Sequence, residues 1–407
     1  MAIDSDGGST GAHSKSASSK TAFFNDPKIR SKVIQVVLVT VIVYAAWSLI
    51  SNTATNLSNQ GKVFGFSFLR NASGFPASQA LIDYSRESSF IQVYFVGLLN
   101  TLLVAVIGII LATLLGFSIG VARLSKNWII SRSAYWYVEF LRNIPLLLWI
   151  FIFYFGVLRL LPTKEAWGQG GWFEGQLGYL NVKGWSAPKP VAGELLWITG
   201  AAILIGIVAS FLLSNWARKR QMATGQQFPS GLASLGLIVG MPLIIFLVTG
   251  LPLSFELPTL GNFGPRGGIK IIPEFIALLL ALTIYTSAFI AEIVRAGILA
   301  INKGQTEASY ALGLRAKPTL NLVIIPQALR VIIPPLTNQY LNITKNSSLA
   351  VAIAYPDLVS IFAGTALNQS GREVEIIMIT MATYLALSLL TSAFMNWYNN
   401  RMALVER

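Results

Sequence analysis

Long apolar runs dominate this sequence and restrict it to one class of fold. Each run holds about 20 residues, the length that crosses the hydrocarbon core of a bilayer as an α-helix. The runs lie at about residues 33–50, 96–121, 145–161, 195–213, 232–251, 275–299, 323–349 and 376–395. Only 12% of the residues are charged, whereas a soluble globular domain has about a quarter. We therefore predict an all-α integral membrane protein with about eight transmembrane helices.

The basic residues indicate how the predicted helices are oriented. The net charge is +13, and Lys and Arg gather in short segments between alternate apolar runs. These segments are the N-terminal tail, residues 123–132, residues 218–220, residues 303–317 and the C-terminal tail. Eight helices put all five on one side of the membrane, and loops rich in Lys and Arg remain in the cytoplasm. We expect both termini, and Glu307, to be cytoplasmic.

The apolar runs also set the predicted domain boundaries. Residues 1–31 are rich in Ser, Gly, Lys and Ala, which is typical of a disordered basic tail. The first helix and a loop facing the periplasm fill residues 32–94, the other helices fill residues 95–400, and residues 401–407 form a C-terminal tail. The Gly-, Trp- and Pro-rich residues 162–194 and 252–273 are predicted to be loops and turns.

The second apolar run carries a stripe of small residues. Gly108, Ala112, Gly116 and Gly120 recur every four positions and therefore share one face of a helix. Small residues on one face let a neighbouring helix approach closely. The neighbour is either a helix of this chain, which we favour, or a helix of another subunit.

The side chains needed for most enzyme chemistry are missing from this sequence. It has no cysteine, and its one histidine, His13, lies in the polar tail. Thiol chemistry, histidine-based catalysis and most zinc sites are therefore not expected. The sequence also lacks the G-x-x-x-x-G-K-[ST] phosphate loop of ATPases. We predict a non-catalytic chain with no metal site and no cofactor of its own.

A polar loop at about residues 301–322 lies between the sixth and seventh apolar runs. Gln305 or Thr306 can begin a short helix there, because polar side chains cap the free N–H groups of a helix start. Glu307 then falls in the first turn, where the helix dipole favours a negative charge. The loop is predicted to be a cytoplasmic contact for another protein.

The rest of this loop indicates a second short helix. Ala308 and Ser309 are small and let another surface approach. Gly313 suits the left-handed residue that ends a helix. Pro318 suits the first turn of the helix that follows. The loop therefore reads as two short helices joined at Gly313, with the basic residue Arg315 beyond the turn.

The same loop carries a family resemblance. Glu307-Ala308-Ser309, Gly313 and Val323-Ile324-Ile325-Pro326 resemble the E-A-A, G and I-x-L-P signature of ABC importer permeases, with both spacings kept. Ser309 replaces the second Ala, and Ala316-Lys317-Pro318 departs from the pattern at the start of the second helix. Four more segments resemble the polar-amino-acid branch of these permeases: residues 97–102, 137–147, 288–297 and 345–350.

The resemblance covers roughly residues 60–400 and implies a MetI-like permease core of five helices. One N-terminal helix and an inserted helix pair at about residues 195–251 complete the chain, as in the larger Q-type permeases of general L-amino-acid importers. Such a permease lies in the bacterial inner membrane and does not hydrolyse ATP. Its implied partners are ABC ATPase subunits that bind ATP and Mg, a second homologous permease subunit, and a periplasmic amino-acid-binding protein that delivers the substrate. The implied contacts to the ATPase are Glu307, Ala308, Ser309, Gly313, Arg315 and Pro326.

Charged residues inside the predicted helices need partners, because an unpaired charge at the bilayer centre costs about 2.5–3.5 kcal/mol. Glu292 and Arg295 lie three residues apart and can pair on one helix face. Glu139 and Arg142, just before the third run, can extend the pairing. We favour a structural ion-pair network, with a direct role in transport as the alternative.

The seventh run is the most polar and contains two prolines. Asn338, Asn342 and Lys345 fall at helical steps beyond Pro334 and Pro335. Interrupted helices line cavities in transporters, and a zwitterionic substrate needs such donors and acceptors. These residues, with Asn100 of the second run as a weaker candidate, are predicted either to line a translocation pathway or to hydrogen-bond between helices.

Two other functions compete with the permease. A self-sufficient secondary transporter or channel would carry its own ion-coupling acids at mid-membrane and would work without an ATPase. An intramembrane enzyme would need a metal motif or a nucleophile with its base, and the sequence offers neither. The sequence does not indicate which amino acids are carried.

Overall fold

The computed structural model describes residues 27–59, 64–163, 177–261 and 264–402. Contacts between residues divide the chain into two units, residues 1–67 and residues 68–407. In the first unit, α2 (Pro27–Asn59) is a single helix that contains the first predicted span. Its apolar side chains are exposed along its length, as expected of a helix surrounded by lipid. Residues 1–26, most of the predicted tail, lie outside the described residues.

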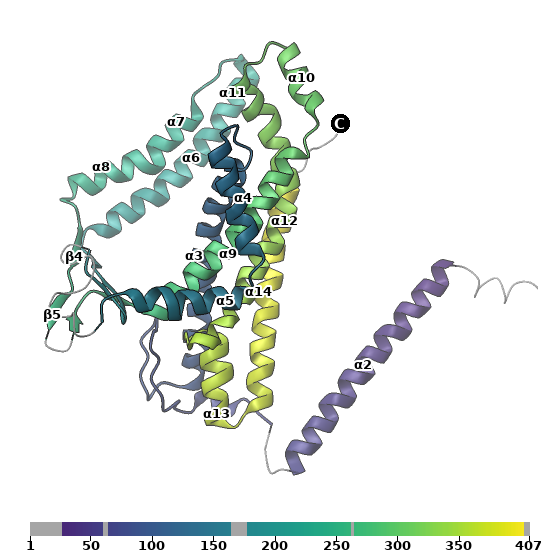
Figure 1. The fold of residues 1–407 in the computed structure, drawn as a ribbon, viewed down its shortest axis with the longest axis vertical. Coiled ribbons are helices and arrows are strands. Elements are labelled where there is room, and N and C mark those ends of the chain that lie inside the picture. The colour runs from purple at the N-terminus through teal and green to yellow at the C-terminus, as the bar shows by residue number, and fades with distance from the viewer. Residues whose placement is uncertain (1–26, 60–63, 164–176, 262–263, 403–407) are drawn as a thin grey trace, which may run out of the picture. The chain divides into compact units, whose positions relative to one another are not determined.

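The second unit is built mainly of helices (Figure 1). The long ones are α3 (Phe90–Ala122), α6 (Leu196–Thr224), α9 (Pro273–Leu299), α12 (Ile325–Asn346) and α14 (Glu373–Met402). The shorter ones are η1 (Ser67–Arg70, beginning at the unit boundary), α4 (Trp128–Arg142), α5 (Leu146–Phe151), η2 (Ile152–Val157), η3 (Leu158–Leu160), α7 (Ser230–Leu235), η5 (Gly236–Gly240), α8 (Met241–Val248), α10 (Lys303–Ala311), α11 (Ala316–Thr319), η6 (Leu320–Ile324), η7 (Ser347–Ile353), η8 (Leu358–Ala366) and α13 (Leu367–Ser370).

Seven helical segments among the described residues are long and apolar enough to cross a membrane, and one bent pair would be an eighth. The predicted count of about eight is confirmed. The second part of the bent pair, from α5 to η3, corresponds to the third span predicted at about residues 145–161. The chain bends by 102° between α4 and this part. The bend follows from Pro145, which lacks an N–H group and disfavours helical backbone at the residue before it.

Helices α3 and α9 form the centre of the second unit, and the stripe of small residues lies between them. A Cβ atom on Gly116 would come within 2.6 Å of the Ile290 side chain, and one on Gly120 within 2.7 Å of the Ala291 carbonyl oxygen. Only glycine permits this approach. The favoured prediction, that the stripe packs within this chain, is confirmed for these two positions.

The inserted pair forms a hairpin of α6 against α7, η5 and α8. Among the described residues, three small antiparallel sheets adjoin its ends. The first has the strand order β1-β2-β7, with β1 (Tyr179–Asn181), β2 (Gly184–Ala187) and β7 (Ile269–Ile271). The other two are pairs: β3 (Lys189–Ala192) with β4 (Leu253–Glu256), and β5 (Thr259–Gly261) with β6 (Gly264–Arg266). Both regions had been predicted as loops and turns only. The pairings β2–β7 and β3–β4 join segments that lie before and after the hairpin in sequence. A local sequence pattern therefore does not predict them.

The chain after α9 turns back twice before it ends. A short loop segment with α10 leads through α11 and η6 into α12, which continues as η7. A turn at residues 354–357 then starts η8 and α13, and α14 runs back towards the end where α10 lies (Figure 1). The same end holds the junction of α6 and α7, so two of the basic segments share one side. The predicted C-terminal tail begins inside α14, which extends to Met402.

Candidate coupling loop and polar helix face

The loop predicted to contact another protein begins with a well-capped helix, α10. The Asn302 side chain accepts a hydrogen bond from the Gly304 N–H at 2.8 Å, the arrangement for which Asn is preferred at a helix start. The helix therefore starts at Lys303 rather than at Gln305 or Thr306. Glu307 consequently lies in the second turn, so the predicted first-turn position was wrong. Its side chain is exposed.

The far end of α10 is fixed by Gly313. Its φ of +76° is the left-handed conformation predicted for it. The Gly313 N–H donates to the Tyr310 carbonyl at 2.9 Å, and the Leu314 N–H donates to the Ser309 carbonyl at 3.1 Å. This pair of bonds is the Schellman motif, which closes the free carbonyl groups at a helix end. The turn is therefore closed by hydrogen bonds within the loop itself.

Ser309 and Gln305 tie α10 to itself and to the helix that follows. Ser309 is buried, and its hydroxyl donates to the Gln305 carbonyl at 2.6 Å. The side-chain oxygen of Gln305 accepts a hydrogen bond from Gln327 Nε2 at 3.1 Å. Gln327 belongs to α12, directly after Pro326. The loop is thus joined to the start of α12 by a side-chain contact as well as by the chain.

The second half of the loop is continuous with α12. The helix α11 starts after Arg315, whose side chain does not cap it, which agrees with the departure from the signature at Ala316-Lys317-Pro318. Pro318 lies in this first turn, as predicted. From Ala316 the chain stays helical through the π-helical turn η6 to the end of α12, and Pro326 occupies the second position of α12. No loop separates α11 from the polar helix.

The exposed surface of α10 includes two apolar side chains that the sequence analysis did not select. Tyr310 is 52% exposed and Leu312 is 82% exposed. They accompany the exposed Glu307, Ala308 and Arg315. An exposed apolar patch with a polar rim is typical of a protein interface. Two apolar residues inside a polar loop were the available signal in the sequence.

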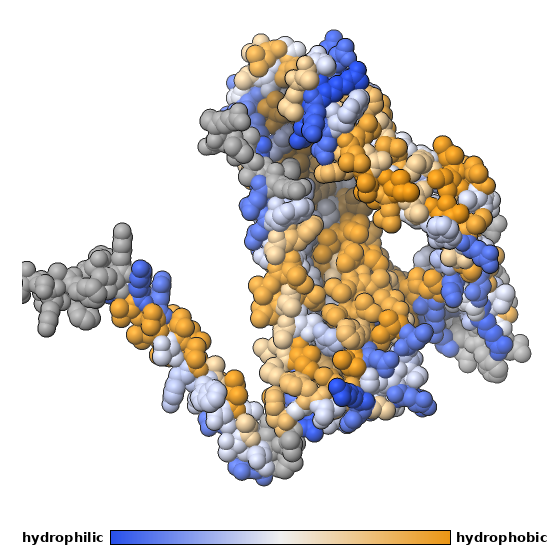
Figure 2. Space-filling model, turned by 180° about the vertical axis from the view of Figure 1, so that it is seen from behind, coloured by the Kyte–Doolittle hydropathy of each residue, from blue (hydrophilic) through white to orange (hydrophobic). Residues whose placement is uncertain are grey.

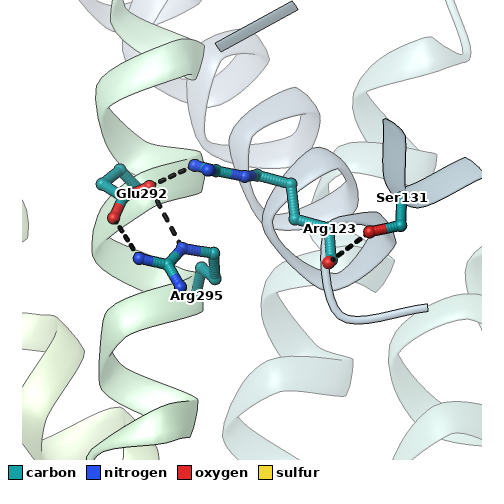
Figure 3. Close-up of polar contacts among 4 residues, drawn as sticks. All are labelled: Arg123, Ser131, Glu292 and Arg295. Atoms are coloured by element: carbon teal, nitrogen blue, oxygen red, sulfur yellow. Dashed lines mark hydrogen bonds and ion pairs between the residues drawn. The ribbon is translucent and has the colours of Figure 1, made fainter. Parts of the chain in front are cut away.

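A charged cluster lies between the end of α3 and the last turns of α9 (Figure 3). Glu292 accepts from Arg295 at 2.6 Å between Oε1 and Nη2, and it also pairs with Arg123. The Arg123 carbonyl accepts a hydrogen bond from the Ser131 hydroxyl at 2.9 Å. Arg123 had been assigned only to a basic loop, because nothing in the sequence places the end of α3 beside α9.

Glu139 and Arg142 are not part of this charged cluster. The backbone carbonyl of Glu139 accepts hydrogen bonds from the N–H group and the side-chain amide of Asn143. Arg142 is exposed, and its guanidinium lies 5.1 Å from the centre of the Phe289 ring. The structure therefore brings together only Glu292 and Arg295 of the four predicted residues, with Arg123 as an additional partner.

The polar residues of α12 share a face that the described residues of the chain leave exposed. Asn338, Asn342 and Lys345 are all exposed and follow one another at helical steps. Pro334 and Pro335 lie within the helix and are exposed on the same side. Lys345 also borders a pocket that Tyr384 of α14 lines.

Asn100 lies apart from that face. It is fully buried, and its Nδ2 donates to the Pro356 carbonyl at 2.9 Å and to the Gln79 carbonyl at 3.0 Å. It thereby joins α3 to the turn before η8 and to the segment that precedes α3. Thr101 beside it accepts from the Leu358 N–H at 3.0 Å. The structure thus gives Asn100 a position between segments rather than beside Asn342 or Lys345.

The turn before η8 contains a buried acid that the sequence analysis overlooked. Asp357 is fully buried, and its side chain accepts from the Ser360 N–H at 2.9 Å, which caps the start of η8. Tyr384 of α14 donates a hydrogen bond to the other carboxylate oxygen of Asp357 at 3.4 Å.

The segment that precedes α3 is held by a hydrogen bond of its own. The Tyr84 hydroxyl donates to the Phe75 carbonyl oxygen at 2.8 Å. Burial raises the pKa of Tyr84 above its ordinary value.

Known proteins share these features of the chain. Residues 108–404 match the family described as the inner membrane component of binding-protein-dependent transport systems. This chain belongs to that family. Three relatives align along nearly the whole chain. The general L-amino acid transport system permease protein AapQ of Rhizobium johnstonii is 49% identical, with 98% of each chain covered.

The other two relatives are also permeases. The putative amino-acid ABC transporter permease protein YhdX of Escherichia coli is 47% identical, covering 97% of this chain and 100% of its own. The glutamate/glutamine/aspartate/asparagine transport system permease protein BztB of Rhodobacter capsulatus is 43% identical, covering 94% and 96%. The family membership confirms the predicted permease function and the inner-membrane location, and the described helices confirm the predicted all-α class. It supports the permease over a self-sufficient transporter.

Proposed function

We propose that this permease imports L-amino acids and that α10 is the contact through which a separate ABC ATPase drives it. The substrate class follows from the relatives, whose names specify L-amino acids, amino acids, or glutamate, glutamine, aspartate and asparagine. ATP and Mg are bound by the ATPase, and a periplasmic binding protein delivers the substrate. The side that carries α10 is the cytoplasmic side, so both termini are cytoplasmic.

The connection of α10 to α12, through one closed turn and one side-chain hydrogen bond, carries this proposal. A partner that moves α10 moves a turn closed by Gly313 and held to α12 by the bond between Gln305 and Gln327. The following helix has no flexible break from Ala316 to the end of α12. A displacement at Glu307 is therefore passed to the helix that carries Asn338, Asn342 and Lys345.

The polar face of α12 requires a second permease subunit. Asn338, Asn342 and Lys345 are exposed in one chain, and polar side chains inside a membrane face protein or water, not lipid. A homologous subunit placed against this face encloses a polar pathway between the two. The residues on α12 then offer donors and acceptors to a zwitterion on its way through.

The contact with the ATPase is tested by reversing the charge of Glu307. The Glu307→Arg variant is expressed with the ATPase, the second permease and the binding protein. We expect it to lose copurification with the ATPase and to lose amino-acid uptake, because an exposed acid is replaced by a cation in a loop that already holds Lys303, Arg315 and Lys317. The matched control is Glu87→Arg, which reverses an exposed acid on the segment before α3.

Copurification and ATP-driven uptake are measured in the same membranes. Normal ATPase binding and normal uptake in Glu307→Arg would show that this loop is not the coupling site. Uptake by the permease without ATPase or ATP would show that the whole proposal is wrong and would favour a secondary transporter.

A further inference from the structure

A pocket of about 400 Å³ lies between α4, α9 and α12. Its walls are formed by Arg142 of α4, by the last turns of α9 from Phe289 to Ala300, and by Gln339 with two neighbours on α12. The volume falls in the range of small-molecule sites, roughly 300–1,000 Å³. Ala296 and Ala300 line this space with small side chains, and Gly297 lets α9 approach Ile332 of α12 beside it.

Arg142 is held in this pocket by an aromatic ring. Its guanidinium lies 5.1 Å from the centre of the Phe289 ring. The ring face attracts the cation without using its N–H groups, and the planar fork of those groups matches a carboxylate. This contact therefore leaves the N–H groups of Arg142 as donors for a ligand.

The nearest acid in the pocket does not neutralise Arg142. Glu292 lines the same pocket, but both of its carboxylate oxygens bind other arginines. Arg295 contacts Oε1 and Oε2, and Arg123 contacts Oε2. Among the residues that the structure describes, Glu292 therefore forms ion pairs with Arg123 and Arg295 but not with Arg142. The pocket lining thus holds one acid that is already paired and one arginine outside that pairing.

The remaining lining selects a small amphipathic ligand. Ile293, Ala296, Val331 and Pro335 provide apolar contact, and Gln339 offers one amide group opposite the arginine. Gln339 directly follows Asn338, so the pocket adjoins the polar face of α12. A carboxylate bound at Arg142 would place the rest of an amino acid against these apolar and amide groups.

We infer that the Arg142 pocket binds the α-carboxylate of an amino acid on the α10 side of the permease. The inference rests on the proposed function, because it identifies a site that the imported substrate occupies near the coupling end of its path. Arg142 belongs to neither the ion-pair cluster nor the polar face of α12. It is a separate specificity residue that requires a carboxylate.

The experiment measures binding of radiolabelled L-glutamine to the purified importer complex, without binding protein. We expect Arg142→Gln to weaken binding about tenfold or more, the loss expected for a charge-assisted hydrogen bond. Arg142→Lys should recover part of it, because the charge remains and the planar fork is lost. Decarboxylated glutamine, the amine that lacks the α-carboxylate, should bind the unaltered complex weakly. It should bind the Arg142→Gln complex with the same weak affinity, because it has no carboxylate to lose a contact.

The control is Arg132→Gln on the same helix. Arg132 also stacks on a ring, 5.0 Å from the centre of Tyr135, but it does not line the pocket. Subunit assembly and ATPase activity are checked in every variant, so a folding defect is recognised. Equal binding by Arg142→Gln and the unaltered complex, an equal loss in Arg132→Gln, or no binding by the unaltered complex would each overturn the inference.

ATP-driven uptake with the binding protein separates this inference from the proposed function. If the unaltered complex imports glutamine and Arg142→Gln binds it normally, only the pocket assignment is wrong. If the unaltered complex imports no amino acid under ATP, the proposed function is wrong.

Discussion

Helices α6 and α12 each leave a long face uncovered in a single chain, and the two faces differ in chemistry. On α6 the exposed side chains are apolar, with Leu204 at 67% and Val208 at 60% exposure. On α12 the exposed side chains include Asn338, Asn342 and Lys345. The hairpin that contains α6 is largely orange in Figure 2, whereas the strands next to it carry blue.

The difference shows which surroundings each face requires. Lipid tails are as apolar as Leu and Val, so lipid alone can cover the hairpin. Amide and ammonium groups find no partners in lipid and need water or protein beside them. The exposed area of a membrane protein therefore does not identify a functional face, but the chemistry of that area does.

The largest effect that tests this comparison is the reaction of single cysteines with a water-soluble maleimide. The natural sequence has no cysteine, so one substitution gives one label site. We expect Asn342→Cys to be labelled in the assembled importer and Val208→Cys to remain unlabelled, because the reagent and the thiolate both require water. Mass spectrometry of the intact chain measures the labelled fraction.

The comparison fails if Val208→Cys reacts as fast as Asn342→Cys in sealed membranes. A second informative result is an unreactive Asn342→Cys both with and without ATP. That result would place protein rather than a water-filled pathway against α12. Leu204→Cys serves as the control for α6, since it is a second exposed position on the same face.

A smaller effect on uptake is expected when single polar side chains are removed from the face of α12. Asn342→Ala and Lys345→Ala remove one polar contact each, and a single hydrogen bond contributes about 0.5–1.5 kcal/mol, or roughly two- to tenfold. We expect uptake to fall by that factor with the ATPase still bound. Val208→Ala on α6 should leave uptake unchanged. Uptake rates against substrate concentration measure the effect, and normal kinetics in both α12 variants would remove these residues from the pathway.

Much of the fold could be predicted because its signals are local. The apolar runs predicted every described span, since hydrophobic length is a property of consecutive residues. The conformation of Gly313 was predicted for the same reason, because a helix end and a glycine lie next to each other in sequence. The signature from Glu307 to Pro326 further identified the family before any contact was known.

The remaining features depend on contacts between distant segments. The bond from Asn100 to the Pro356 carbonyl joins residues 256 positions apart, and Arg123 meets Glu292 from a separate helix. Neither pair shows a spacing that a sequence pattern could reveal. Arg142 was predicted to pair with an acid, but it stacks on Phe289, because Glu292 already binds two other arginines.

The smallest effect on transport is expected from the packing of the hairpin itself. A Cβ atom on Gly206 of α6 would come within 2.2 Å of the Leu237 carbonyl oxygen, whereas one on Gly200 would meet nothing within 4 Å. Gly206→Leu must therefore push α6 away from η5, which costs about 1–3 kcal/mol as an overpacked contact. Gly200→Leu on the same helix should be neutral or slightly stabilising, since Leu favours helix more than Gly. The melting temperature of the purified importer measures both.

Uptake by the two glycine variants then decides whether the hairpin takes part in transport. If lipid is its only neighbour, Gly206→Leu lowers the melting temperature while uptake and ATPase binding remain normal. A Gly206→Leu complex that assembles fully but no longer imports amino acids would contradict this expectation. That result would mean that the hairpin takes part in the transport cycle, as we propose for α12. The apolar face of α6 would then be a functional surface and not only a lipid contact, so its difference from the polar face of α12 would no longer indicate function.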